Sequence, residues 1–167
     1  SVVGLVAITV EADQQPDYFY GQTAPVHVTA ESPHAKCGTY GGAFKLVYRQ
    51  KITSEMKSRE QWRSLNSNDP AADTFSILNE LEHFRRLDGT FEFKMVWPEM
   101  EGPNTQQWRQ TNEPLSTYLV TGYEEVDVNF RESNWGGLAL STNGVTLLDG
   151  SPTSDDFWFS VGAQRPF

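Results

Sequence analysis

The chain has 167 residues, enough for one domain to bury a core without disulfide or metal staples. It carries 22 acidic against 13 basic residues and a formal net charge of −9, so nucleic-acid phosphates and anionic lipids would repel it. No stretch approaches the roughly 20 apolar residues of a membrane helix. We therefore expect a single domain over residues 1–167 that neither binds nucleic acid nor inserts into a membrane.

The first ten residues contain several β-branched side chains and lack both an initiator methionine and a basic segment. Such residues fit a pleated strand better than the apolar core of a leader peptide. The segment predicts a first strand over residues 2–11 and the processed start of a secreted, extracellular protein. The remnant of a signal peptide is the alternative. Further strands are predicted over residues 26–30 and 43–49.

The stretch over residues 69–87 has the features of one amphipathic helix. It begins with a cap residue and a proline and ends with two arginines, as helices often do. Its apolar side chains recur every three residues, at Phe75, Leu78, Leu81 and Phe84. We expect this helix to cover one face or one open edge of a sheet.

Alternating strands dominate the C-terminal half. Between residues 90 and 97, apolar side chains alternate with polar ones, which predicts a half-buried antiparallel strand. Its apolar face would consist of Phe91, Phe93, Met95 and Trp97. Val126, Val128 and Phe130 alternate in the same way and predict a second such strand.

Asn143-Gly144 separates two short apolar segments, residues 138–142 and 145–148. This dipeptide predicts a hairpin with a type I′ turn, which needs positive φ at both positions. The last strand is expected to end near residue 161. The predicted fold class is mostly β: an antiparallel β-sandwich or strongly twisted meander with one amphipathic helix.

Cys37 is the only cysteine, so no disulfide can form within the chain. It lies in a glycine-rich stretch that we expect to be exposed. A lone exposed cysteine in a secreted protein often pairs with its copy across a twofold axis, which predicts a covalent homodimer through an intermolecular disulfide. A small buried hydrophobic residue is the equally supported alternative.

Motifs for catalysis are missing from the sequence. The three histidines do not follow a metal-binding spacing, and neither a nucleophile elbow nor a phosphate-binding glycine loop occurs. A glycoside hydrolase would need two carboxylates across a cleft, and Glu99, Glu101, Asp149, Asp155 and Asp156 are numerous enough to supply them. We expect no enzyme and keep the hydrolase as an alternative.

Two acidic loops supply the oxygen atoms that a hard cation prefers. Calcium takes about six to eight oxygens, and two such loops can hold it while leaving positions open for a ligand. The predicted metal ligands are Glu99, Glu101 and Asn104 in one loop and Asp155 and Asp156 in the other. The alternative is that these residues only form turns and keep the loops soluble.

Side chains beside these loops suit a sugar. Trp158 or Trp108 would stack on the apolar face of a galactose ring, and Gln107 or Arg109 would form hydrogen bonds to its hydroxyls. The alternative for each tryptophan is a place in the core.

Five segments carry a family resemblance: residues 108–114, 122–123, 135–138, 147–150 and 158–162. In these motifs the chain resembles a group of secreted cnidarian proteins, and within that group the sea-anemone calcium-dependent galactose-binding lectins. The likeness runs from about residue 91 to 162. It implies a β-rich dimer that recognises terminal β-galactose with the help of calcium.

The sequence thus predicts a secreted, homodimeric, calcium-dependent lectin that binds galactose and terminal β-galactosides such as lactose without catalysis. Relatives in the same group resemble extracellular matrix modules, so a structural or adhesive module is the alternative.

Overall fold

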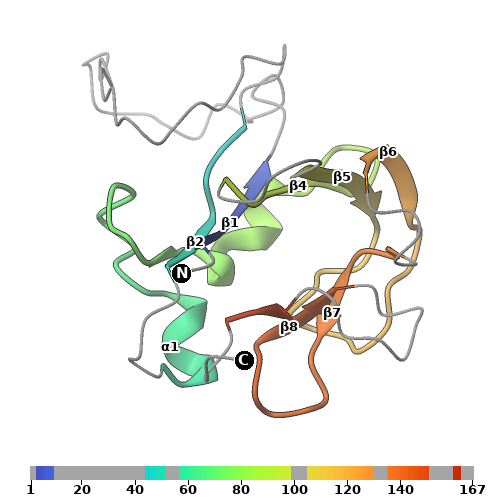
Figure 1. The fold of residues 1–167 in the computed structure, drawn as a ribbon. Helices are drawn as coiled ribbons and strands as arrows, with labels where there is room; N and C mark the ends of the chain where they lie inside the picture. Colours follow the sequence, from blue (N-terminus) through green and yellow to red (C-terminus); the bar gives the residue numbers. More distant parts are fainter. Residues whose placement is uncertain are drawn as a thin grey trace.

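The computed structural model describes residues 3–9, 44–51, 57–98, 105–129, 135–150 and 160–162, with the backbone alone for residues 3–9 and 160. It is mostly β, with 33% strand and 13% helix, and its sheets are antiparallel. This confirms the predicted fold class. Figure 1 shows a large sheet with a small one below it.

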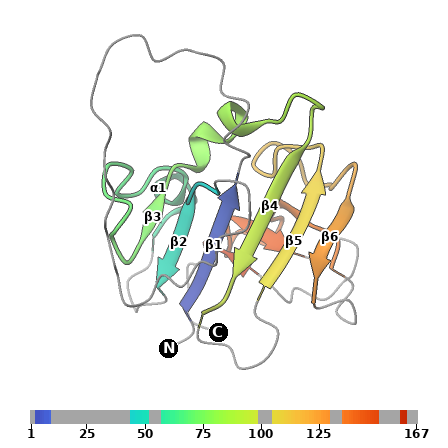
Figure 2. The same cartoon turned by 90° about the horizontal axis from the view of Figure 1, so that it is seen from above.

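The elements of the described residues follow one another in this order: β1 Val3–Thr9, β2 Tyr48–Lys51, α1 Arg59–Arg63, β3 Phe75–Ser76, η2 Leu78–Phe84, β4 Phe91–Val96, β5 Thr105–Gln110, β6 Glu124–Val128, β7 Leu138–Leu140, β8 Leu148–Gly150 and β9 Ser160–Val161. The large sheet has the order β3-β2-β1-β4-β5-β6, and the small sheet has the order β7-β8-β9. Figure 2 shows β1 between β2 and β4, so the first strand of the chain lies in the middle of the large sheet.

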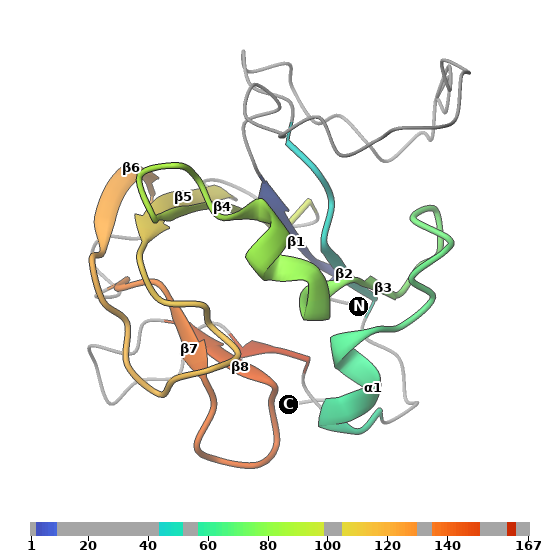
Figure 3. The ribbon, with the colours of Figure 1, turned by 180° about the vertical axis from the view of Figure 1, so that it is seen from behind.

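Aromatic side chains fill the space between the two sheets. Phe93 of β4 lies 5.4 Å from Phe91 and 5.5 Å from Trp108 of β5, measured between ring centroids. Trp108 meets the edge of Trp135 at 4.8 Å. The face predicted for residues 90–97 is confirmed as buried, because Phe91, Phe93, Met95 and Trp97 are at most 7% exposed. Figure 3 shows the small sheet beneath the β4–β6 half of the large one.

The helix expected over residues 69–87 is wrong in its extent and its type. The chain instead forms the short strand β3 and then η2, a 3-10 helix of seven residues. A 3-10 helix has three residues per turn, so the three-residue spacing places Leu78, Leu81 and Phe84 on one buried face. An α-helix, with 3.6 residues per turn, would turn these side chains progressively away from that face.

The helix α1 was not among the predicted elements, although its start has a sequence signature. Ser58 Oγ accepts from the Gln61 backbone N–H at 3.2 Å, and Gln61 Oε1 accepts from the Ser58 N–H at 2.8 Å. This reciprocal pair is a capping box. The next residue, Arg59, donates to the carbonyl oxygens of Thr146 and Ser141 and so ties α1 to the β7–β8 connection.

The predicted hairpin pairing is confirmed, because β7 pairs antiparallel with β8, but the predicted type I′ turn is wrong. Its connection is longer than a two-residue turn and covers residues 141–147. Within the dipeptide only Gly144 has positive φ, at 74°. Asn143 contributes its side chain instead, because its Oδ1 accepts from the backbone N–H groups of Val145 and Thr146 at 2.8 and 3.2 Å.

The strand β6 forms one edge of the large sheet. Its pairing with β5 shifts by one residue between Gln107 and Trp108, and Val126 is the extra residue of this bulge. Val126 is 41% exposed while Val128 is 6% exposed, so the shared buried face predicted for these two residues is wrong. The bulge breaks the alternation on which that prediction depended. The third member of the pattern, Phe130, lies outside the described residues.

The connection from β5 to β6 is tied to η2 through Arg85. The Arg85 guanidinium donates two hydrogen bonds to Glu82, at 2.8 and 2.6 Å, and two more to the carbonyl oxygens of Gly89 and Thr111. It also lies 4.2 Å from the centroid of the Phe91 ring.

Glu113 belongs to the same connection, and the pKa of its carboxyl is shifted from the ordinary value. Burial raises the pKa of the Glu113 carboxyl, and the negative charge of Glu82 adds to the rise. A pKa that is higher in the folded state means that the ionised form destabilises the fold at neutral pH, and that this effect vanishes below the unfolded pKa. We therefore predict that Glu113→Gln raises the urea midpoint at pH 7 and leaves it nearly unchanged at about pH 3.5. An equal rise at both pH values would contradict this explanation.

Candidate functional site

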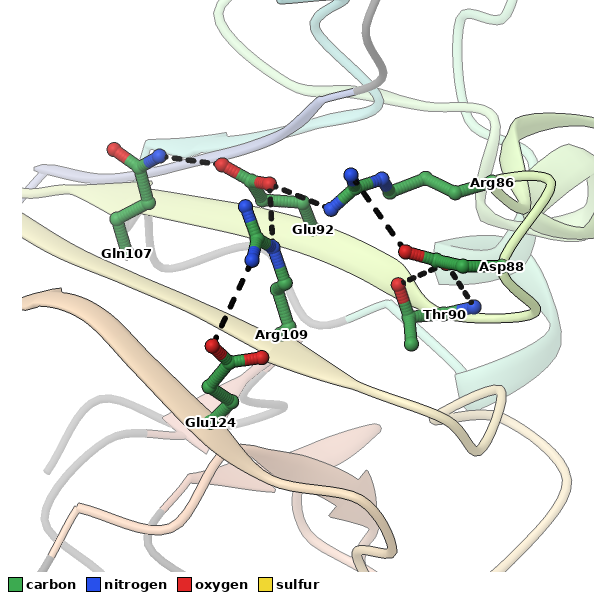
Figure 4. A network of polar contacts seen from close by, with 7 residues as sticks. All are labelled: Arg86, Asp88, Thr90, Glu92, Gln107, Arg109 and Glu124. Atoms are coloured by element: carbon green, nitrogen blue, oxygen red, sulfur yellow. Dashed lines mark hydrogen bonds and ion pairs between the residues drawn. The ribbon is translucent and has the colours of Figure 1, made fainter.

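A cluster of polar and charged side chains covers the outer face of the large sheet, across β4, β5 and β6 (Figure 4). The alternation that sends Trp108 of β5 into the core points its neighbours Gln107 and Arg109 to the opposite side. Glu92 of β4 lies directly across from Arg109 in the strand pairing and faces the same way.

The Glu92 carboxylate is the centre of this cluster. Its Oε2 accepts from Arg109 Nε at 2.9 Å and from Arg86 Nη1 at 3.0 Å, and its Oε1 accepts from Gln107 Nε2 at 2.7 Å. The Glu92 side chain is 15% exposed. Three donors on one shielded carboxylate hold Arg109 and Gln107 in fixed orientations.

Two further carboxylates flank the arginines. Asp88 Oδ2 lies 3.6 Å from Arg86 Nη2, and Glu124 Oε1 of β6 lies 3.7 Å from Arg109 Nη1. Hydrogen bonds from the Thr90 hydroxyl and backbone N–H lower the pKa of Asp88, because they stabilise the ionised carboxylate. The hydrogen bond to Glu92 raises the pKa of Arg109, because it stabilises the charged guanidinium.

Some hydrogen-bonding atoms of the cluster remain open. Within the described part of the chain, Arg109 Nη2 and Gln107 Oε1 form no hydrogen bond, and the Arg109 side chain is 31% exposed. A hydroxyl group can accept from the first and donate to the second. The arrangement therefore offers a donor and an acceptor, on two rigidly held planar groups, to a ligand rich in hydroxyls.

Of the four residues predicted to contact a sugar, the structure brings Gln107 and Arg109 together on this face. Trp108 is different, because it is fully buried and its Nε1 donates to Gln110 Oε1 at 2.8 Å. A ring enclosed by the core cannot stack on a sugar, so the alternative of a core role is correct for Trp108. The fourth residue, Trp158, lies outside the described residues.

The other predicted site residues also lie outside the described ranges; they are the metal ligands Glu99, Glu101, Asn104, Asp155 and Asp156 and the disulfide candidate Cys37. Among the residues that are described, no group of three or more His, Cys, Asp or Glu side chains is arranged to hold a metal ion.

The described strands do fix where the two acidic loops are anchored. The first loop enters β5 at Thr105, whereas the second leaves β8 at Gly150, which pairs with Leu138. Leu138 exchanges hydrogen bonds with the Gln110 side chain at the far end of β5. The anchor of the first loop at Thr105 therefore lies at one end of β5, and the anchor of the second loop at Gly150 lies near the other end. The strand β5 has six residues and is roughly 17 Å long.

The other five cluster members were not predicted as site residues from the sequence; they are Arg86, Asp88, Thr90, Glu92 and Glu124. The alternation in residues 90–97 places Glu92 on the polar face of its strand, but its role depends on the pairing with β5, which a single strand pattern does not specify. The bulge in β6 places Glu124 opposite Arg109 and is equally invisible in the sequence pattern.

Asp149, which stood among the possible carboxylates of a hydrolase, has a structural position. It is 6% exposed, and its Oδ1 accepts from the Thr146 hydroxyl at 2.7 Å. This carboxylate therefore closes the β7–β8 hairpin.

Comparison with known proteins gives no match to a family model, a curated protein or a solved structure. In the described ranges, no helix has the length and apolar character to cross a membrane.

Proposed function

We propose that the chain is a calcium-dependent lectin that binds galactose and terminal β-galactosides such as lactose, without catalysing a reaction on them. The observation that carries the proposal is the convergence of Gln107 and Arg109 on Glu92, with Arg109 Nη2 and Gln107 Oε1 open to a ligand. Glu92 acts as a positioning residue, because it orients both side chains.

The expected metal ligands fit calcium by their chemistry. Carboxylates and one amide offer only oxygen atoms, which is the ligand type that calcium selects. When bound, the ion would supply coordination to two adjacent sugar hydroxyls. Arg109 would donate to a further sugar oxygen, and Gln107 would accept from another hydroxyl. Trp158 is proposed as the ring that stacks on the sugar.

A single site of this kind would bind weakly, towards the millimolar end of the affinity scale. Two sites in one homodimer, linked through Cys37, would raise retention on a multivalent surface without any new contact. The proposed location, a secreted and oxidising environment, is compatible with such a bridge.

The proposal predicts that the protein is retained on a lactose matrix in the presence of calcium and released by EDTA. Retention that EDTA leaves unchanged would refute the calcium requirement. Passage through the column without retention would refute the lectin and favour a structural or adhesive module. Release of galactose from an aryl β-galactoside would instead show a hydrolase.

A matched pair of variants tests the site itself. Arg109→Met should weaken lactose binding by about tenfold, since it removes a charged donor that the ligand uses. Arg63→Met is the control, because Arg63 has a similar side-chain exposure, 35% against 31%, and contacts a glutamate, Glu60, but lies on α1. Equal losses in both variants would mean that Arg109 acts only through stability.

A further inference from the structure

We infer that this site admits uncharged galactosides and rejects those that carry a sulfate or carboxylate, and that Glu124 sets this preference. The inference rests on the proposed function and adds the charge class of the ligand. It follows from the way neighbouring carboxylates neutralise the positive charges of Arg86 and Arg109.

Each guanidinium of the cluster is bracketed by two carboxylates. Glu92 bonds both arginines through the same oxygen, at 2.9 and 3.0 Å. On the outer side, Glu124 lies 3.7 Å from Arg109, and Asp88 lies 3.6 Å from Arg86. An arginine that recognises a sulfate or carboxylate presents its fork to that anion. In this cluster, Asp88 already lies next to the guanidinium of Arg86, and Glu124 already lies next to that of Arg109.

Among the described residues on and next to β4, β5 and β6, the charges on this face sum to a negative value. The cations are Arg86, Arg109 and Lys94, and the anions are Asp88, Glu92, Glu124 and Asp127. Asp127 belongs here because it lies opposite Gln107 in the strand pairing. Lys94 contributes little at the surface, since it is 8% exposed and lies over the Phe44 ring. A ligand anion would thus meet net repulsion, whereas a hydroxyl finds the open donor and acceptor.

Of the carboxylates in the cluster, Glu124 is the one whose removal would most reduce the repulsion of an anionic ligand. Its side chain is 64% exposed, on the edge strand β6, whereas the Glu92 side chain is 15% exposed and holds three donors. Without the Glu124 charge, the outer nitrogens of Arg109 would face solvent with a partly uncompensated positive charge. Such a fork would accept an anion bidentately.

The test compares the dissociation constants of lactose and of lactose sulfated on its galactose, measured by ligand-observed NMR at low salt. We expect the wild-type protein to bind the neutral sugar about tenfold more tightly, and Glu124→Gln to reduce this preference about fivefold. Glu125→Gln is the matched control, because it removes the same charge from the neighbouring residue, which pairs with the inward-facing Trp108. Its preference should stay at the wild-type value.

Salt separates charge repulsion from steric exclusion. The wild-type preference for the neutral sugar should shrink in 1 M NaCl, where the screening length falls to about 3 Å. A preference that persists at high salt would overturn the inference, as would equal binding of both sugars by the wild-type protein or an unchanged preference in Glu124→Gln. Binding of lactose without discrimination would refute this inference alone, whereas binding of neither sugar would refute the proposed function together with it.

Discussion

Replacement of Gln110 with leucine is expected to lower the free energy of unfolding by about 4 kcal/mol. Gln110 is fully buried, and its side-chain oxygen accepts from Trp108 Nε1 at 2.8 Å and from the Leu138 N–H at 3.0 Å. Its amide nitrogen donates to the carbonyl oxygens of Leu138 and Asn112 at 2.9 and 3.0 Å. The side chain thus joins β5 to the small sheet much as a neighbouring strand would. Leucine would leave these buried groups unpaired.

The measurement is urea denaturation, with Gln107→Leu as the control. Gln107 is the same residue type on the same strand, but it lies on the outer face, where solvent can replace its bond to Glu92. We expect this control to change the free energy of unfolding by less than about 1 kcal/mol. A loss in Gln110→Leu no larger than that of the control would show that the bridge between the sheets contributes little.

Replacement of Gly137 with alanine is expected to cost about 3 kcal/mol of folding free energy. Gly137 has a φ of 95°, which an L-residue adopts only with strain. A Cβ atom there would also lie 2.8 Å from Gln110 Oε1 and 3.2 Å from Trp108 Nε1. The methyl group would therefore push apart the hydrogen bond that connects these two side chains.

Gly144→Ala separates the two causes. Gly144 also has positive φ, at 74°, but a Cβ atom at this position would meet nothing within 4 Å. The free energy of unfolding of this variant should fall only by the cost of backbone strain, about 1 kcal/mol. If thermal or urea denaturation gave equal losses for both variants, the close approach at Gly137 would carry no energy of its own.

The sequence predicted several strands, because each strand pattern is local, but it missed β5 of the large sheet. The alternation in residues 90–97 depends only on which side chains avoid water, and the structure buries those it selects. The same spacing rule failed for the helix, since apolar residues every three positions fit both a short α-helix and a 3-10 helix. The 3-10 helix is the form that keeps Leu78 and Phe84 on one buried face.

The candidate site was less predictable, because it depends on strand pairing. Gln107 and Arg109 were selected as polar neighbours of a predicted loop, and the structure places them on one face. Their shared partner Glu92 is 15 positions from Gln107 in the sequence and follows only from the antiparallel register of β4 and β5. For Trp108 the sequence left both a sugar contact and a core position open, because a tryptophan beside polar residues has the same pattern in a core as at a surface.

The edges of the large sheet restrict how two copies of the chain can associate. At one edge, the bulge at Val126 interrupts the ladder of β6, and exposed carboxylates line that strand. At the other edge, β3 has only two residues. Neither offers a long, regular row of free backbone groups on which a strand from another molecule could add. Among the described residues, these two edges of the large sheet therefore disfavour a homodimer that continues this sheet across its interface.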